Sequence, residues 1–183
     1  MTGAGSRALS PAALATVVRR AQEAAPEEAC GSVRRSGPLR RARNVQDELH
    51  RSDPLRYPRT ARTAFEMSAD DLLEVDRSLA GDDPVEIVYH SHPGGAGAYF
   101  SAGDERRNVV DGTPLVPVDH LVVAVGTDGG PAGRVSMDGT GAAASSRSAF
   151  SRSERRPTWP MPTCLSRCPG VSAPTQTARA SGR

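Results

Sequence analysis

The stretch from Val88 to Asp104 reads V-Y-H-S-H-P-G-G-A-G-A-Y-F-S-A-G-D, and it joins the end of an apolar run to a glycine-rich turn and a helix start. Successive side chains of an extended strand point to opposite faces of a sheet. We therefore expect His90 and His92 to project to one side and Ser91 to the other. Two imidazoles on one face of a strand can bind one metal ion.

The chain after His92 is expected to fold back toward this strand. The segment from Pro93 to Phe100 cannot continue a central strand, and Ser101 to Asp104 has the pattern of a helix start. Such a turn brings Asp104 to the histidines and gives two nitrogen ligands and one carboxylate oxygen. Three protein ligands of this type, with a fourth position left for water, are typical of a catalytic zinc site. The sequence therefore predicts Zn2+ at His90, His92 and Asp104.

The order His-Ser-His-Pro, glycine-rich turn, Ser-x-x-Asp resembles the signature of the JAMM (JAB1/MPN/Mov34) metalloproteases, a family of zinc isopeptidases and peptidases. In that family an upstream glutamate completes the site, commonly in a Pro-x-Glu segment that leads through a glycine into the first core strand. Residues 26–31 read P-E-E-A-C-G. The resemblance therefore assigns this position to Glu28, with the neighbouring Glu27 as the alternative.

The resemblance covers about residues 10–138 and implies a fold. It is an α/β domain of the α+β type, in which a mixed central β-sheet is flanked by helices in the cytidine-deaminase-like JAB/MPN architecture. We expect one metallopeptidase domain over residues 1–138. Residues 139–183 are rich in Arg, Ser and Pro without sustained periodicity, and they predict a disordered tail. This tail is either a native ending or the product of a shifted reading frame.

The expected chemistry is metal-assisted hydrolysis, in which zinc lowers the pKa of a bound water toward neutrality. The resemblance implies that Glu28 takes the proton of the water and delivers it to the leaving amine, and that Ser101 donates a hydrogen bond to the developing oxyanion. Plainer roles remain open. Ser101 and Asp104 are also suitable as an N-cap and a first-turn acid, and Glu28 as a surface acid.

One feature departs from the family pattern. The family usually has seven residues between the second histidine and the serine, whereas Pro93 to Phe100 contains eight. The additional residue falls among Gly94, Gly95 and Gly97, where glycine lets a turn absorb an insertion at small cost. We expect the site to survive. If the loop does not absorb the residue, Asp104 moves away and metal affinity is lost.

Composition limits the class of protein. A chain of 183 residues is long enough for one domain with a full core. All 23 basic residues are arginine, and the net charge of +2 combines −4 over residues 1–138 with +6 over residues 139–183. The basic character therefore belongs to the tail and does not indicate a nucleic-acid-binding fold. Three cysteines and the absence of an apolar run of ~20 residues predict a soluble cytoplasmic protein that does not bind membranes.

Hydrophobic periodicity and turn signals predict the remaining elements. We expect helices and strands in the following order: helix 11–24, strands 29–33, 39–44 and 63–67, helix 68–79, strand 85–89 leading into the histidines, helix 104–110, strand 121–125 and its hairpin partner 133–137. The polar stretch 46–62 is expected to form a loop or short helix. It serves either as a wall or lid of the substrate groove or as a solvated connector.

Several other reactive or aromatic residues receive simpler interpretations. Cys30 is expected to be a small buried residue rather than a nucleophile, and His50 and His120 lack a partner at ligand spacing. Cys164 and Cys168 are two incidental cysteines rather than half of a metal site. Tyr99 and Phe100 either line the groove or pack on the core.

The leading functional hypothesis is a zinc metallopeptidase similar to bacterial single-domain JAMM proteins. Those relatives cut after the C-terminal Gly-Gly of ubiquitin-like or sulfur-carrier proteins, in some cases with release of cysteine. The resemblance thus implies a carrier protein as substrate and a narrow groove for its extended tail. The alternative is a non-catalytic MPN-type interaction module, although such modules typically lose ligands that this chain retains. A His-x-His phosphoesterase is disfavoured, because proline and glycine follow the pair. The sequence does not indicate an oligomeric state.

Overall fold

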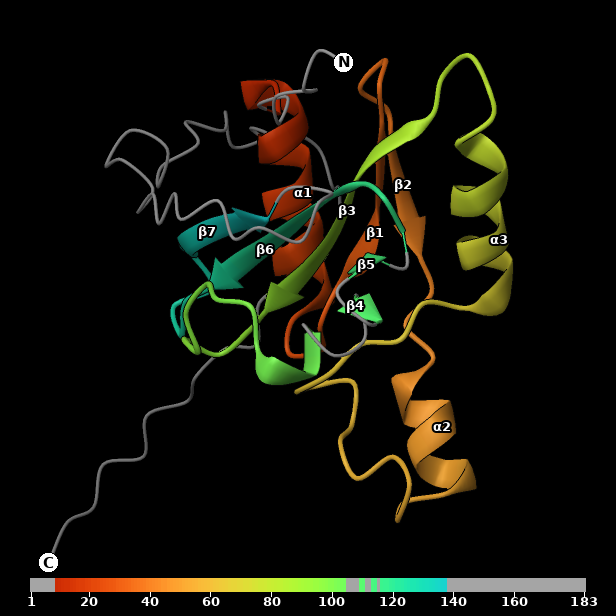
Figure 1. Cartoon of the computed structure of the whole chain (residues 1–183). Helices are drawn as coiled ribbons and strands as arrows, with labels where there is room; N and C mark the ends of the chain where they lie inside the picture. Colours follow the sequence, from red (N-terminus) through yellow and green to blue (C-terminus); the bar gives the residue numbers. More distant parts are fainter. Residues whose placement is uncertain (1–8, 105–108, 111–112, 115, 138–183) are drawn as a thin grey trace, which may run out of the picture.

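A mixed five-stranded sheet forms the centre of the protein (Figure 1). The structure, a computed structural model, describes residues 9–104, 109–110, 113–114 and 116–137. The strands follow the order β2-β1-β3-β6-β7, in which only β3 and β6 are parallel. Their bounds are β1 Cys30–Arg34, β2 Leu39–Ala42, β3 Val85–His92, β6 Asp119–Val125 and β7 Pro131–Met137. This arrangement confirms the predicted mixed sheet flanked by helices, and it places the histidine pair on the central strand.

Helix α1, Pro11–Ala24, covers one face of the sheet, as predicted (Figure 1). Its N-terminus is capped by Ser10, whose side chain accepts a hydrogen bond of 3.2 Å from the Ala13 amide. Val17 and Ala21 on its apolar stripe are buried. Val17 shares a core cluster with Tyr89 and other inward-facing residues of β1, β3 and β6. The α1 face is therefore the closed, apolar side of the sheet.

Helix α3, Ala69–Ser78, packs on the opposite face of the sheet. Helix α2, Gln46–Ser52, lies below the sheet in Figure 1. The Ser68 side chain caps α3 by accepting a hydrogen bond from the Asp71 amide, as predicted. Val75 of α3 belongs to a second core cluster that contains Val88 of β3. Because side chains alternate along a strand, His90 and His92 lie on this face together with Val88.

Two predicted elements differ in the structure. The strand predicted at 63–67 is wrong: only Met67 forms a bridge, with Asn44. The Thr63 and Ala64 amides both donate to the Thr60 carbonyl, so a turn interrupts the alternating sequence. The predicted helix 104–110 is helical only up to Asp104 among its described residues. Val109–Val110 instead forms β4, which pairs with β5, Thr113–Pro114, because β-branched residues favour strands.

The predicted tail, with Cys164 and Cys168, lies outside the described residues. Within the described ranges, no helix is long and apolar enough to cross a membrane.

Candidate metal centre

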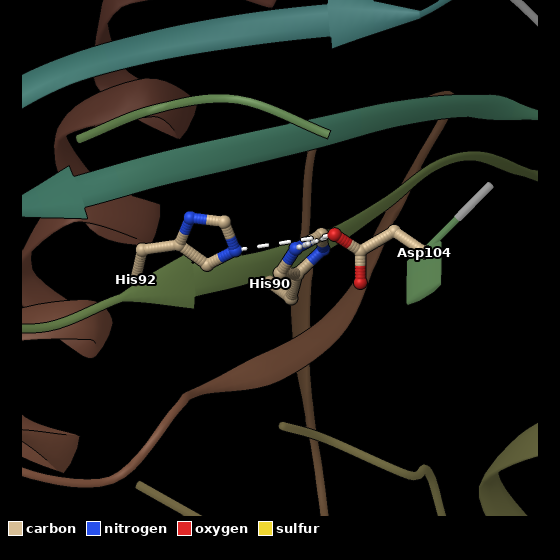
Figure 2. Close-up of side chains that lie close together, drawn as sticks. All are labelled: His90, His92 and Asp104. Atoms are coloured by element: carbon tan, nitrogen blue, oxygen red, sulfur yellow. Dashed lines mark ion pairs between the residues drawn. The ribbon is translucent and has the colours of Figure 1, made fainter. Parts of the chain in front are cut away.

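His90 and His92 lie at the C-terminal end of β3 and point to the same side of the sheet (Figure 2). Both are buried, at 2% and 6% exposure. The intervening Ser91 faces the other side, where its hydroxyl accepts a hydrogen bond of 2.8 Å from the Ala29 amide. The strand alternation predicted from the sequence is therefore present, and it directs both imidazoles away from α1.

Asp104 reaches the two imidazoles from the first turn of the helical segment that begins at Ala102 (Figure 2). Ser101 and Asp104 cap this turn reciprocally: the Ser101 amide donates to Asp104 Oδ2 at 2.7 Å, and the Asp104 amide donates to Ser101 Oγ at 3.1 Å. This is the geometry of a capping box. The cap fixes the carboxylate whose Oδ2 lies 3.6 Å from His90 Nε2 and 4.0 Å from His92 Nε2.

The glycine-rich loop absorbs its additional residue. Gly94, Gly95 and Gly97 have φ values of 73°, 80° and 83°, in the left-handed region that glycine adopts without strain. The Gly95 amide donates to the Val125 carbonyl at 2.9 Å, which fastens the loop to the end of β6. The Gly97 carbonyl lies 3.0 Å from His92 Nδ1. The longer loop therefore orients a ligand instead of displacing one.

The three side chains fit a tetrahedral metal ion. One ligand atom from each of His90, His92 and Asp104 lies within 4.8 Å of the other two. Metal bonds of about 2 Å require ligand atoms about 3.3 Å apart, close to the 3.6 Å and 4.0 Å separations from the carboxylate oxygen. His90 Nε2 is buried and has no hydrogen-bond partner among the described residues. A cation would satisfy this nitrogen. Because His92 Nδ1 donates its proton to the Gly97 carbonyl, the lone pair of His92 is on Nε2 and is available to the same cation.

The protonation states also suit a cation. Burial lowers the pKa of His92, and the neighbouring His90 lowers it further, so the ring is neutral at pH 7. Burial alone would raise the pKa of Asp104, but the His90 imidazole and the hydrogen bonds from Ser101 outweigh it and hold that pKa well below its usual range. Neutral imidazole and ionised carboxylate are the forms that bind metals.

Glu28 lies in the same cleft as these ligands. It is 6% exposed, whereas Glu27 is exposed to solvent. The register of β1 on β3 pairs Ser32 with Val88 and Cys30 with His90, and its continuation by two residues sets Glu28 opposite His92. The Glu28 amide donates to the Ala61 carbonyl at 2.7 Å. The structure therefore brings Glu28, rather than Glu27, to the predicted ligands.

The cleft has a volume of about 180 Å3 and is open to solvent at one side. Its lining contains the predicted site residues except the deeper His90, together with residues of two loops: Glu28, Arg59, Arg62, Thr63, His92, Pro93, Ala96, Tyr99, Ser101 and Asp104. The segment after α2 is thus a wall of the cleft, which decides between the two roles that the sequence left open for this stretch.

Aromatic rings surround the imidazoles. Tyr99 meets His92 edge-on at 4.8 Å between ring centroids, and Phe100 lies 6.3 Å from His90. Phe65 stacks on His90 at 4.4 Å. The sequence did not assign Phe65 to the site, because its alternating neighbours favoured a strand. Arg59 and Arg62 were also missed, since no spacing rule links them to a motif some 30 residues away.

The other reactive residues do not join the cluster. Cys30 is fully buried, and burial raises the pKa of its thiol to about 12, so it remains protonated and is no nucleophile. His50 Nδ1 lies 2.7 Å from the Tyr57 carbonyl oxygen. His120 is buried on β6, where burial lowers its pKa to about 4. It borders a separate, largely apolar cavity of about 330 Å3 between α3 and the sheet.

Similarity to known proteins is found at the level of a family model. A model of the family described as prokaryotic homologs of the JAB domain matches residues 10–137. Among solved structures, the chain is similar to the solution structure of protein DSY2949 from Desulfitobacterium hafniense. The two share 19% sequence identity and a TM-score of 0.47, over 71% of this chain and 83% of that chain. No significant match is found among the curated proteins.

Proposed function

The chain belongs to the prokaryotic homologues of the JAB domain, and from this membership we propose that it is a zinc-dependent metallopeptidase. Its substrate is a peptide or isopeptide bond that follows the C-terminal Gly-Gly of a ubiquitin-like or sulfur-carrier protein. The single observation that supports this activity most strongly is the buried cluster of His90, His92 and Asp104 with a buried carboxylate, Glu28, in the same cleft. Three protein ligands leave a coordination position open for water, as in catalytic rather than structural zinc sites.

His90, His92 and Asp104 would hold the ion. When bound, a zinc ion supplies a Lewis acid that polarises a carbonyl and makes hydroxide available near neutral pH. Two of the ligands are already oriented for metal binding. The Gly97 carbonyl orients the His92 ring, and the Ser101 amide orients the Asp104 carboxylate. Because the ligands are fixed by these contacts, little reorganisation accompanies binding.

Glu28 is the proposed general base and acid. It takes a proton from the attacking water and passes it to the amine of the leaving group. It lies two residues before β1, where the pairing with β3 continues through the hydrogen bond from the Ser91 amide to the Ala29 carbonyl, so its backbone is held opposite His92. Its burial keeps bulk water from competing for the same proton.

Ser101 is the proposed oxyanion donor. Its oxygen accepts from the Asp104 amide, and its hydroxyl is hydrogen-bonded to the Asp104 carboxylate. Ser101 lines the cleft, so its hydroxyl can turn from this carboxylate to a substrate carbonyl that becomes negative during attack. This role is compatible with the cap, because one hydroxyl accepts and donates at the same time.

The dimensions of the cleft favour a glycine-rich substrate. At about 180 Å3 it is smaller than the ~300–1,000 Å3 typical of sites that enclose small-molecule ligands. Tyr99, Arg59, Arg62 and Thr63 are among its lining residues, and a cleft of this volume has space for an extended backbone rather than for bulky side chains. A Gly-Gly tail meets this requirement because neither residue carries a side chain.

A matched pair of variants tests the proposal. The substrate is a peptide ending in Gly-Gly-Ala, and the readout is release of the terminal residue by zinc-loaded protein. Glu28→Gln should lower kcat by about 100-fold or more, because the base is lost while the shape is kept. Glu27→Gln makes the same change on an exposed neighbour and should leave kcat within about twofold.

Zinc content and thermal unfolding are measured on both variants to show that metal and fold are retained. A Glu28→Gln variant that cleaves as well as wild type would remove Glu28 from the mechanism. Zinc-loaded wild-type protein that cleaves no Gly-Gly peptide would instead favour a non-catalytic interaction module.

A further inference from the structure

Two arginines line the cleft beside the metal cluster and have no role in the chemistry proposed above. Arg59 and Arg62 belong to the loop that follows α2, and both side chains are exposed at the cleft. Among the described residues neither guanidinium forms an ion pair, whereas Arg34 pairs with Glu74 and Arg35 with Glu86. Two positive charges therefore line the cleft without an acidic partner in the part of the chain that the structure describes.

The loop that presents these arginines is fixed at several points. The Arg59 carbonyl accepts a hydrogen bond of 2.7 Å from the side chain of Gln46, which is 1% exposed. The Ala61 amide donates to Asp47 Oδ1 at 2.6 Å, and its carbonyl accepts from the Glu28 amide at 2.7 Å. The backbone under the arginines is thus tied both to α2 and to the segment before β1 that contains the proposed base. A preorganised backbone reduces the entropy lost on binding.

Arg59 also lies close to the metal ligands. Its Nη1 is 3.3 Å from the point that a Cβ atom on Gly103 would occupy, next to Asp104 in the chain. The absence of a side chain at Gly103 leaves this space to the guanidinium. A group bound by Arg59 would therefore sit within the same small cleft as the scissile bond.

We propose that Arg59 and Arg62 bind a carboxylate of the substrate next to the scissile bond, as specificity determinants of the peptidase; this inference rests on the proposed function. Arginine is suited to this role because its planar donors match a carboxylate bidentately. In a peptide substrate such a carboxylate is either the free C-terminus of the residue after the scissile bond or an Asp or Glu side chain there. The cleft then selects substrates whose leaving group is an acidic or C-terminal residue.

Three peptides distinguish these sources. They end in Gly-Gly-Ala with a free carboxylate, in Gly-Gly-Ala amide, and in Gly-Gly-Glu amide. Binding is measured by fluorescence anisotropy of N-terminally labelled peptides on zinc-loaded Glu28→Gln protein, so that no turnover interferes, and kcat/KM is measured on wild type. Each carboxylate-bearing peptide that reaches the arginines should bind about tenfold more tightly than Gly-Gly-Ala amide, the factor expected for partly solvated charge pairs.

Variants then assign the effect. Arg59→Gln combined with Arg62→Gln should abolish the preference for a carboxylate and leave affinity for the amide within about twofold. A double variant with lysine at both positions should keep part of the preference for a carboxylate, because lysine has the positive charge of arginine but lacks its planar donors. Arg56→Gln is the matched control: Arg56 lies on the same loop, over the Tyr57 ring at 5.4 Å, and does not line the cleft.

The outcomes separate this inference from the proposed function. Preference for the free acid alone identifies the C-terminal carboxylate, and preference for both acidic peptides includes the side chain. Carboxylate-dependent binding that the double variant loses supports the inference even if no peptide is cleaved. Binding without a carboxylate preference, or no binding of any peptide, overturns it even if Gly-Gly peptides are cleaved.

Discussion

Zinc should raise the thermal stability of the wild-type protein, and His92→Ala should remove most of that gain. A ligand that binds only the folded state stabilises it by RT ln(1 + [L]/Kd), about 2.7 kcal/mol at a free concentration of 100 Kd. For a domain of this size, each kcal/mol moves Tm by about 3–4 °C. The expected increase is therefore roughly 8–11 °C.

The variant retains only His90 and Asp104 of the three ligands. Loss of a residue that merely supports a ligand lowers metal affinity by ~10–100-fold, so loss of a ligand itself should lower it by at least ~100-fold. The same free zinc concentration then no longer exceeds Kd, and the stabilisation falls to about 0.4 kcal/mol or less. The zinc-dependent shift in Tm should shrink to roughly 1–2 °C.

The assay is thermal unfolding followed by circular dichroism, with buffered free zinc or with chelator, together with the zinc content of the purified protein. His50→Ala is the matched control, because His50 lies outside the cluster and contacts the Tyr57 carbonyl. It should keep the full shift. A His92→Ala protein that shows the wild-type shift and about one bound zinc would refute the assignment of the ligands.

Three further predictions concern the sheet and the cleft. Gly31→Ala should lower the free energy of unfolding in urea by about 2–3 kcal/mol, because the new Cβ would lie 2.3 Å from the Arg40 carbonyl oxygen. Gly81→Ala is the control: its new Cβ would be 3.4 Å from the nearest atom, and the free energy of unfolding should change little. His120 is neutral in the folded state and protonates near pH 6.5 in the unfolded state, so stability should fall with pH between 6.5 and about 4. Between pH 7 and pH 5 the free energy of unfolding of wild type should fall by about 2 kcal/mol more than that of His120→Leu. Urea unfolding that shows the same pH dependence for both proteins would contradict this. Ser101→Ala should keep its zinc, lose about 1 kcal/mol of stability with its cap, and show a kcat about 100-fold lower; an unchanged kcat would exclude the oxyanion role.

The metal cluster was predictable because it depends on local rules. The alternation of a strand fixes the common direction of His90 and His92, and the same rule sends Ser91 to the α1 face. The Ser-x-x-Asp pattern fixes a helix start, and the reciprocal cap holds Asp104 beside the imidazoles. Glycine at positions of positive φ explains why one more residue in the connecting loop does not separate them.

Contacts between distant segments were not accessible in this way. Phe65 alternates with polar neighbours as a strand residue does. In the structure a turn that begins at Thr60 precedes it, Phe65 is not part of a strand, and its ring stacks on His90. Arg59 reaches the cleft because the buried Gln46 and the half-buried Asp47 hold its loop through hydrogen bonds with backbone atoms. A backbone partner carries no sequence signature, so such anchoring is visible only in three dimensions.

The position of Glu28 shows how the sheet itself assembles the site. This residue is far from His92 in the chain, and the antiparallel register that pairs Cys30 with His90 sets the two opposite each other. A shift of one residue would turn Glu28 toward α1, away from the metal ligands. Gly31 opposes Tyr89 in this register, and a Cβ there would lie 2.6 Å from the tyrosine hydroxyl. Only glycine fits beneath the ring, so the residue that weakens β1 locally also fixes the register that places the base.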